Sequence, residues 1–336
     1  MLVKRMKRFS DIDPRSWEHP ADRAALSALK QVPGLDQIVK LLVTVTTERS
    51  MYLMHAASSI KISNNQYPIV NNIVQEIVET FDWHFTPTVF ITQSPFFNAH
   101  TFGVNEPCIV INSTLVTSLS REELKVVIAH EMGHVMSGHS LYKTLIWLLA
   151  NISIKMIPMA GILIMPINIA LAEWDRKSEL TGDRAALLAT QIEDPNFNVL
   201  MRMAGGSDLT QVNINELFIQ AMEFEERKSL LDSFHKMLNQ VWMSHPYPIE
   251  RLKEIKTWAS SGYYTKILEG NYLHRGKHDD TYKEDIRDGF EYYKESASSS
   301  EDPLTKMAHN LGVGLESVTS EISNKFTDFI KNNTKS

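Results

Sequence analysis

The sequence predicts a mostly helical α+β protein that carries one small mixed β-sheet. Apolar residues recur at helical spacing through most of the 336 residues, and two short β-branched runs, PTVFIT and CIVIN, stand apart from that pattern. Hydrophobic residues make up 43% and charged residues 22%, which is ordinary globular usage. The composition excludes a wholly disordered chain and a collagen-like repeat. Cys108 is the single cysteine, so an internal disulfide is excluded too.

The chain before the strands is expected to be helical. Residues 1–65 read as an N-terminal helical extension, in which Pro33-Gly34 marks a turn between two helices. Another helix is expected after Pro68. The short runs between residues 86 and 114 then predict the strands of a small sheet.

The segment Ser120-Arg-Glu-Glu123 predicts the start of a helix. A hydroxyl followed three residues later by a glutamate forms a capping box, in which each side chain binds a backbone amide of the other residue. The helix that follows, LKVVIAHEMGHVM, is expected to end near Gly138.

Residues 141–172 are strongly apolar and allow two interpretations. Within residues 141–172, Lys143 and Lys155 are the only charged residues. A membrane span needs about 20 apolar residues. Pro158 and Pro166 are expected to break the stretch, which favours a pair of buried helices. The alternative is a hairpin inserted in a membrane.

The remaining layout follows from composition. Residues 66–275 are expected to form the main domain, and residues 276–302 a charged, flexible linker. Residues 303–336 are expected to form an amphipathic helix. Its apolar stripe comprises Leu311, Leu315, Val318, Ile322, Phe326 and Phe329.

The net charge and the N-terminal residues limit the partners and the location that we expect for the protein. The formal net charge of −6 argues against a nucleic-acid partner, which requires a basic face. The N-terminal residues contain no secretory leader, so a cytoplasmic location is expected. Peripheral membrane contact could be made through residues 141–172 or 303–332.

The residues that carry chemistry are His130, Glu131 and His134, which form an HExxH motif. Residues four apart share one face of a helix, so both imidazoles can bind one metal ion. Glu131, beside the first ligand, can take a proton from a water held by the metal and pass it to a leaving amine. The apolar neighbours of the motif favour a core helix over a charged surface helix.

A third ligand is expected downstream, in AEWDRKSELTGDRAAL. Glu179 and Asp183 again lie four residues apart on a helical stretch. Alone they would indicate an exposed acidic face, but with HExxH upstream Glu179 completes a His₂Glu site for one Zn²⁺ per chain. Asp183 could then accept the second ring N–H of a ligand histidine.

These motifs resemble the HtpX and CAAX-prenyl-protease type of zinc metallopeptidase, peptidase family 48 of the metallopeptidases. The resemblance spans roughly residues 65–260 and includes FFNAHTFG, HEMGHVMSGH, ELTGDRAAL and SHPYPIERLKEI. It implies a gluzincin-like catalytic core in which the edge strand of the sheet faces the zinc cleft. Thr181-Gly182 departs from the family, where an alanine commonly precedes the aspartate. A glycine there should weaken the helix by up to about 1 kcal/mol.

The resemblance also implies an activity. It indicates a zinc-dependent endopeptidase that acts on peptides or proteins, which would bind along Asn98 and Ala99 by β-augmentation. His245 is the candidate donor to the oxyanion, with a structural helix-capping role as its alternative. Arg251 is expected to be a buried ion-pair partner.

Two other functions stay open at this point. One is a catalytically silent, chaperone-like module that binds peptides on the same fold, and the other is an integral membrane protease with residues 141–172 inserted. His139 is expected either to support the ligands or simply to end the helix. Cys108 is expected to be a buried small hydrophobic residue.

Overall fold

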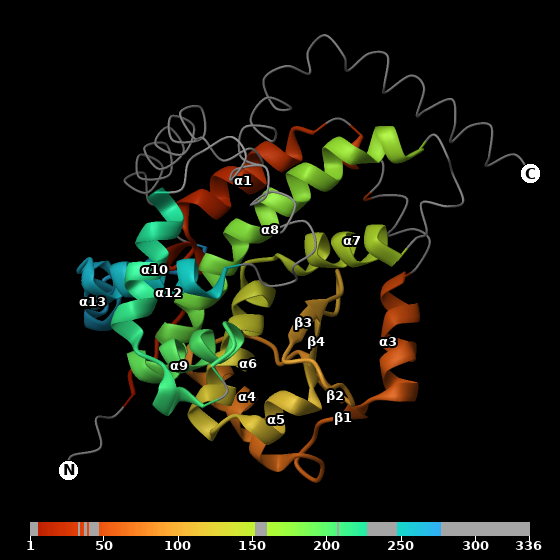
Figure 1. Ribbon diagram of the computed structural model, residues 1–336. Coiled ribbons are helices and arrows are strands. Elements are labelled where there is room, and N and C mark those ends of the chain that lie inside the picture. Colours follow the sequence, from red (N-terminus) through yellow and green to blue (C-terminus); the bar gives the residue numbers. More distant parts are fainter. Residues whose placement is uncertain are drawn as a thin grey trace, which may run out of the picture.

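The computed structural model describes residues 6–32, 34–36, 39, 47–151, 160–206, 208–226 and 247–276. Within them the chain is mostly helical and carries a four-stranded sheet (Figure 1), so the predicted α+β class is confirmed. The main helices are α1 (Pro20–Lys30), α3 (Thr47–Ser58), α4 (Pro68–Thr80), α5 (Ser113–Ser118), α6 (Arg121–Met136), α7 (Ser140–Asn151), α8 (Ala160–Thr190), α9 (Glu193–Met203), α10 (Ile214–Glu226), α12 (Pro248–Ser260) and α13 (Tyr263–Glu269). The strands are β1 (Ile60–Lys61), β2 (Thr88–Thr92), β3 (Ala99–Phe102) and β4 (Cys108–Asn112).

The sheet is mixed, as the sequence predicts, with the strand order β1-β2-β4-β3. β2 and β4 run parallel, with Val89 opposite Ile109, and β3 pairs antiparallel with β4. β4 is buried along its whole length: Ile109 and Ile111 belong to the core cluster that includes α6, and Cys108 and Val110 belong to a smaller cluster with Met51 of α3. β1 and β3 are the two edge strands, and β3 lies against α6 and α7. β1 was not predicted, because two residues are too short to show an alternating pattern.

Helix α6 passes through the centre of the molecule and packs against α8, α4, α9 and β3. It begins at the predicted capping box: Ser120 Oγ accepts from the Glu123 amide, and the Glu123 carboxylate accepts from the Ser120 amide. It ends at Met136, just before Gly138, whose φ of 71° reverses the chain. The position of α6 places the HExxH motif in the core.

The N-terminal residues are part of the folded body. Phe9, Ile12 and Trp17 are fully buried and belong to the same hydrophobic core as α6. Helix α1 packs along α8 (Figure 1), where Leu29 joins Leu171 and Trp174 in a second apolar cluster. The N-terminal extension thus contacts the helix that carries Glu179.

The apolar stretch 141–172 forms α7 and the first part of α8; residues 152–159 lie outside the described part. The expectation that Pro166 breaks this stretch is wrong, because α8 runs through it. Ile167, Ala170 and Leu171 follow the proline and are buried, and their packing offsets the one missing helical hydrogen bond. Among the described helices, none combines the length and apolar character that crossing a membrane requires.

Several predictions fall on residues that the structure does not describe. These are the C-terminal helix at 303–336, the linker at 276–302 apart from Gly276, and His245.

Candidate functional site

The HExxH residues lie in the most buried part of α6. His130 is 6% exposed, Glu131 2% and His134 0%. Buried polar groups are costly unless they have partners, so a helix that carries three of them inward must meet matching groups. The matching groups come from α8.

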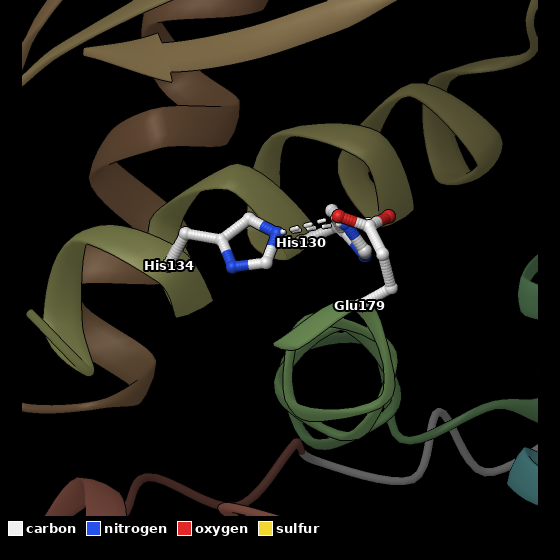
Figure 2. Close-up of side chains that lie close together, drawn as sticks. All are labelled: His130, His134 and Glu179. Atoms are coloured by element: carbon white, nitrogen blue, oxygen red, sulfur yellow. Dashed lines mark hydrogen bonds and ion pairs between the residues drawn. The ribbon is translucent and has the colours of Figure 1, made fainter. Parts of the chain in front are cut away.

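Two helices aim three side chains at one point (Figure 2). His130 Nε2 lies 3.3 Å from Glu179 Oε2, and His134 Nε2 lies 3.3 Å from Glu179 Oε1. The two Nε2 atoms are 3.2 Å apart. The three ligand atoms lie within 4.8 Å of one another, and all three residues are buried. This His₂Glu set is the one that the sequence predicts.

Two glycines bring the helices this close. A Cβ on Gly182 would lie 2.6 Å from the His130 ring, and a Cβ on Gly133 would lie 2.6 Å from Ala185 Cβ. Both distances are shorter than real contacts, so α6 and α8 could not keep this spacing with larger residues. The departure at Gly182, expected to be only a weak point of the helix, is what admits the His130 ring.

The outer nitrogen of His130 is held by a carboxylate. His130 Nδ1 lies 3.1 Å from Asp183 Oδ1, as expected for Asp183. Arg251 donates to both oxygens of Asp183, at 2.8 and 2.6 Å, and also lies 3.0 Å from Glu179 Oε2. Burial alone would raise the pKa of Asp183, but the charge and hydrogen bonds of Arg251 lower it below its usual value. Arg251 is the buried ion-pair partner that the sequence predicts.

The outer nitrogen of His134 meets another histidine. His134 Nδ1 lies 3.0 Å from His139 Nδ1, and His139 Nε2 lies 3.2 Å from Asp22 Oδ2. Thr181 Oγ1 donates to the same Asp22 oxygen at 2.5 Å. His139 therefore contacts His134, the geometry that a supporting role would need.

Glu179 also receives a cation from α7. Lys143 Nζ lies 2.6 Å from Glu179 Oε1 and 2.7 Å from Asp175 Oδ1. Burial lowers the pKa of His134, and the Lys143 charge lowers it further, which keeps this imidazole neutral. Burial also acts against a charge on His130, but Glu179 and Asp183 outweigh it and raise its pKa to about 9.

The charge balance suits a divalent cation. Lys143 and Arg251 interact with four carboxylates, those of Glu131, Asp175, Glu179 and Asp183, and the carboxylate of Asp22 lies behind His139. The formal surplus is three negative charges, and two facing imidazole nitrogens add lone pairs that need a proton or a metal between them. The residues present therefore fit a bound metal ion.

A cavity opens beside this His₂Glu cluster, and His130 is the member of the cluster that lines it. Glu131 and His130 line it, together with Asn98 and Ala99 at the start of β3. The Asn98 Oδ1 atom is buried and accepts no hydrogen bond from the described residues. Asp183, Asn196 and Arg251 add polar groups to the wall. The rest of the wall is apolar and comprises Phe97, Leu115, Val126, Val127, Val199, Leu200 and Met203.

Two residues of the site, Lys143 and Asp22, were not predicted from the sequence. A lysine within an apolar stretch indicates a buried charge that needs a partner, so the sequence could have indicated Lys143 as a buried ion-pair residue. Asp22 carries no comparable signal, because an acid in the first turn of a helix is common.

The chain is similar in sequence to known peptidases. The model of peptidase family M48 matches residues 64–259. The plastoglobule-localized metallopeptidase 48 (chloroplastic) of Arabidopsis thaliana is 32% identical over 267 residues, which cover 78% of this chain and 77% of that protein. A protease HtpX homolog of Helicobacter pylori (strain Shi470) is 28% identical over 162 residues, 44% of this chain and 50% of its own. No solved structure gives a significant match. With a His₂Glu cluster in place and a family match over more than half of its length, the chain belongs to peptidase family M48 and is a metalloprotease.

Proposed function

We propose that this protein is a zinc-dependent endopeptidase that binds one Zn²⁺ through His130, His134 and Glu179. The observation that carries the proposal is the convergence of these three donors beside a cavity lined by Glu131. Two imidazoles and one carboxylate are the ligand set of catalytic zinc sites that keep one position open. When bound, zinc would polarise the scissile carbonyl and acidify a water molecule.

Glu131 is the general base in this proposal. It follows His130 directly on α6, is 2% exposed and lines the cavity. A carboxylate there can accept a proton from water and return it to the leaving amine. His245 remains a proposed donor to the oxyanion.

The substrate would be a peptide in extended conformation. β3 is one of the two edge strands of the described sheet, and its first residue, Ala99, lines the cavity with Asn98. A peptide strand beside β3 would make main-chain hydrogen bonds, and the apolar wall of the cavity would accept an apolar side chain near the cleaved bond. The buried Oδ1 of Asn98 supports this role, because a peptide amide could satisfy it.

The location of the protein stays a prediction. A cytoplasmic site, with peripheral membrane contact through residues 141–172 or 303–332, is consistent with the sequence.

The test is a peptide-library digest that compares the wild type with Glu131→Gln. We expect Glu131→Gln to keep its zinc but to lose roughly 10²–10⁴-fold in kcat/KM, the usual contribution of a general base. Glu122→Gln is the matched control, because Glu122 is a partly exposed acid on the same helix and pairs with Arg121. Unchanged turnover in Glu131→Gln would overturn the assignment. A wild type that holds zinc but cleaves no library peptide would favour the catalytically silent, peptide-binding alternative.

A further inference from the structure

We infer that Asp22, on helix α1, is a positioning residue for the metal site and acts on His134 through His139. The inference rests on the proposed metal site and adds a residue from outside the segment that matches the family, residues 64–259. Three contacts carry it: His134 Nδ1 to His139 Nδ1, His139 Nε2 to Asp22 Oδ2, and Thr181 Oγ1 to the same Asp22 oxygen.

The carboxylate of Asp22 determines the direction of this chain of hydrogen bonds. An ionised carboxylate only accepts, so His139 must carry its proton on Nε2 and offer a lone pair at Nδ1. His134 must then donate from its own Nδ1, which leaves its Nε2 with a lone pair. That Nε2 is the atom that faces Glu179 and His130. One aspartate thus selects the tautomer of a ligand two hydrogen bonds away.

Asp22 is held where it can do this. It lies in the first turn of α1, 1% exposed, and α1 packs along α8 (Figure 1). Thr181 lies on α8 between Glu179 and Asp183, and its hydroxyl also accepts from the His19 amide at 3.0 Å. The second unusual residue of the α8 motif, Thr181, is therefore the one that joins α8 to α1.

The ring of His139 is fixed in turn by Trp174. The two rings meet edge to face, with centroids 5.3 Å apart, and His139 is 1% exposed. A ring with both nitrogens engaged and one edge against an indole has little freedom to rotate. His139 therefore transmits the constraint from Asp22 instead of absorbing it.

The stability of the fold does not by itself explain why the carboxylate of Asp22 is buried. Among the described residues, no lysine or arginine forms an ion pair with Asp22, and its Oδ1 accepts no hydrogen bond. A buried charge that is only half satisfied costs stability, which points to a role in the site.

Zinc affinity of Asp22→Asn tests the inference, measured by competition between the protein and a chromophoric chelator for Zn²⁺ alone. An asparagine can turn its amide donor toward His139 Nε2, which favours the opposite tautomer along the chain. We expect about a tenfold loss of zinc affinity, the low end for partners that orient metal ligands. The absorption spectrum of the Co²⁺-loaded protein should shift as well, and kcat at saturating zinc should fall with KM unchanged.

Asp13→Asn is the matched control. Asp13 is also a buried aspartate of the N-terminal segment, but it pairs with Arg15 and touches none of the residues of the metal site. We expect Asp13→Asn to keep the zinc affinity and the Co²⁺ spectrum of the wild type. An equal loss in both variants would mean that loosening of the segment explains the effect, and would overturn the inference.

A second pair of variants keeps the inference testable if Asp22→Asn fails to fold. A glutamine at position 139 can accept from His134 with its oxygen and donate to Asp22 with its nitrogen, whereas a leucine can do neither. We expect His139→Gln to bind zinc at least fivefold more tightly than His139→Leu, on the scale of about 10–100-fold for such partners. Equal affinities would overturn the inference. A wild type that binds no zinc would instead contradict the proposed function itself.

Discussion

The two histidines that we propose as metal ligands, His130 and His134, are supported in different ways on the two sides of the site. On one side, Asp183 holds His130 directly, and Arg251 neutralises that aspartate with two hydrogen bonds. On the other side, the outer nitrogen of His134, Nδ1, reaches a carboxylate through His139, and that carboxylate, Asp22, comes from α1. We call these the Asp183 side and the Asp22 side.

The two sides are expected to differ in how much they stabilise the fold and how much they only orient a histidine. Asp183 and Arg251 form a buried ion pair. Without Arg251 the buried Asp183 would lose its cation, and without Asp183 the buried Arg251 would keep Glu179 as a counter-ion but lose the carboxylate to which it makes two hydrogen bonds. Asp22 has a histidine and a hydroxyl as partners, and its loss leaves no buried lysine or arginine unpaired among the described residues. The Asp183 side should therefore affect both folding and metal binding, whereas the Asp22 side should affect mainly metal binding.

The largest expected effect is that of Asp183→Asn. It should lower the free energy of unfolding by about 3 kcal/mol, the low end for a broken buried ion pair, because Arg251 loses one of its two buried counter-ions and keeps Glu179. It should also weaken zinc binding by about 10–100-fold. Chemical denaturation and chelator competition measure the two effects.

The double variant Asp183→Asn with Arg251→Met separates them. Removal of both charges should restore much of the unfolding free energy, because a buried ion pair replaced by uncharged groups is often neutral. Zinc affinity should stay low, since His130 Nδ1 still lacks its carboxylate. Full recovery of zinc affinity in the double variant would contradict the role given to Asp183.

The sequence determined one side of the site better than the other. Glu179 and Asp183 follow from helical spacing once HExxH is recognised, and Arg251 follows from the family resemblance. The Asp22 side could not be predicted in the same way, because its contact with His139 joins residues far apart in the chain. The strand pattern of β2 and β4 predicted the sheet, but β1 was too short to show one.

Gly182→Ala should have a smaller effect, and its sign is informative. Helix propensity alone would stabilise α8 by about 1 kcal/mol. The new Cβ would lie 2.6 Å from the His130 ring, so we expect a net destabilisation of about 1–3 kcal/mol, the usual cost of overpacking. Zinc affinity should fall too, because the ring that must move is a ligand. A stabilised variant with wild-type zinc affinity would show that the close approach of α6 and α8 is not required.

The smallest effect is expected at the start of α6, far from either side of the site. Burial would raise the pKa of Glu123, but its hydrogen bonds to Ser120 and its pairing with Arg202 lower it below the usual 4.5. A lowered pKa stabilises the fold above pH 4.5, and this contribution disappears as the pH falls through the folded-state value.

Glu123→Gln should therefore be less stable than the wild type at pH 7, by about 1 kcal/mol, as for other lost helix caps. The difference should shrink below pH 4.5, and zinc affinity at pH 7 should not change. Thermal melts from pH 3 to pH 7 measure this. A stability difference that stays constant across that range would contradict the role given to the capping box.

The central claim is that two helices aim His130, His134 and Glu179 at one metal ion. Elemental analysis of the purified, unchelated protein beside its Glu179→Gln variant tests this claim most directly. We expect one zinc per chain in the wild type. In Glu179→Gln we expect zinc that a chelator removes far more readily. A wild type without zinc, or a variant that holds zinc as tightly as the wild type, would contradict it.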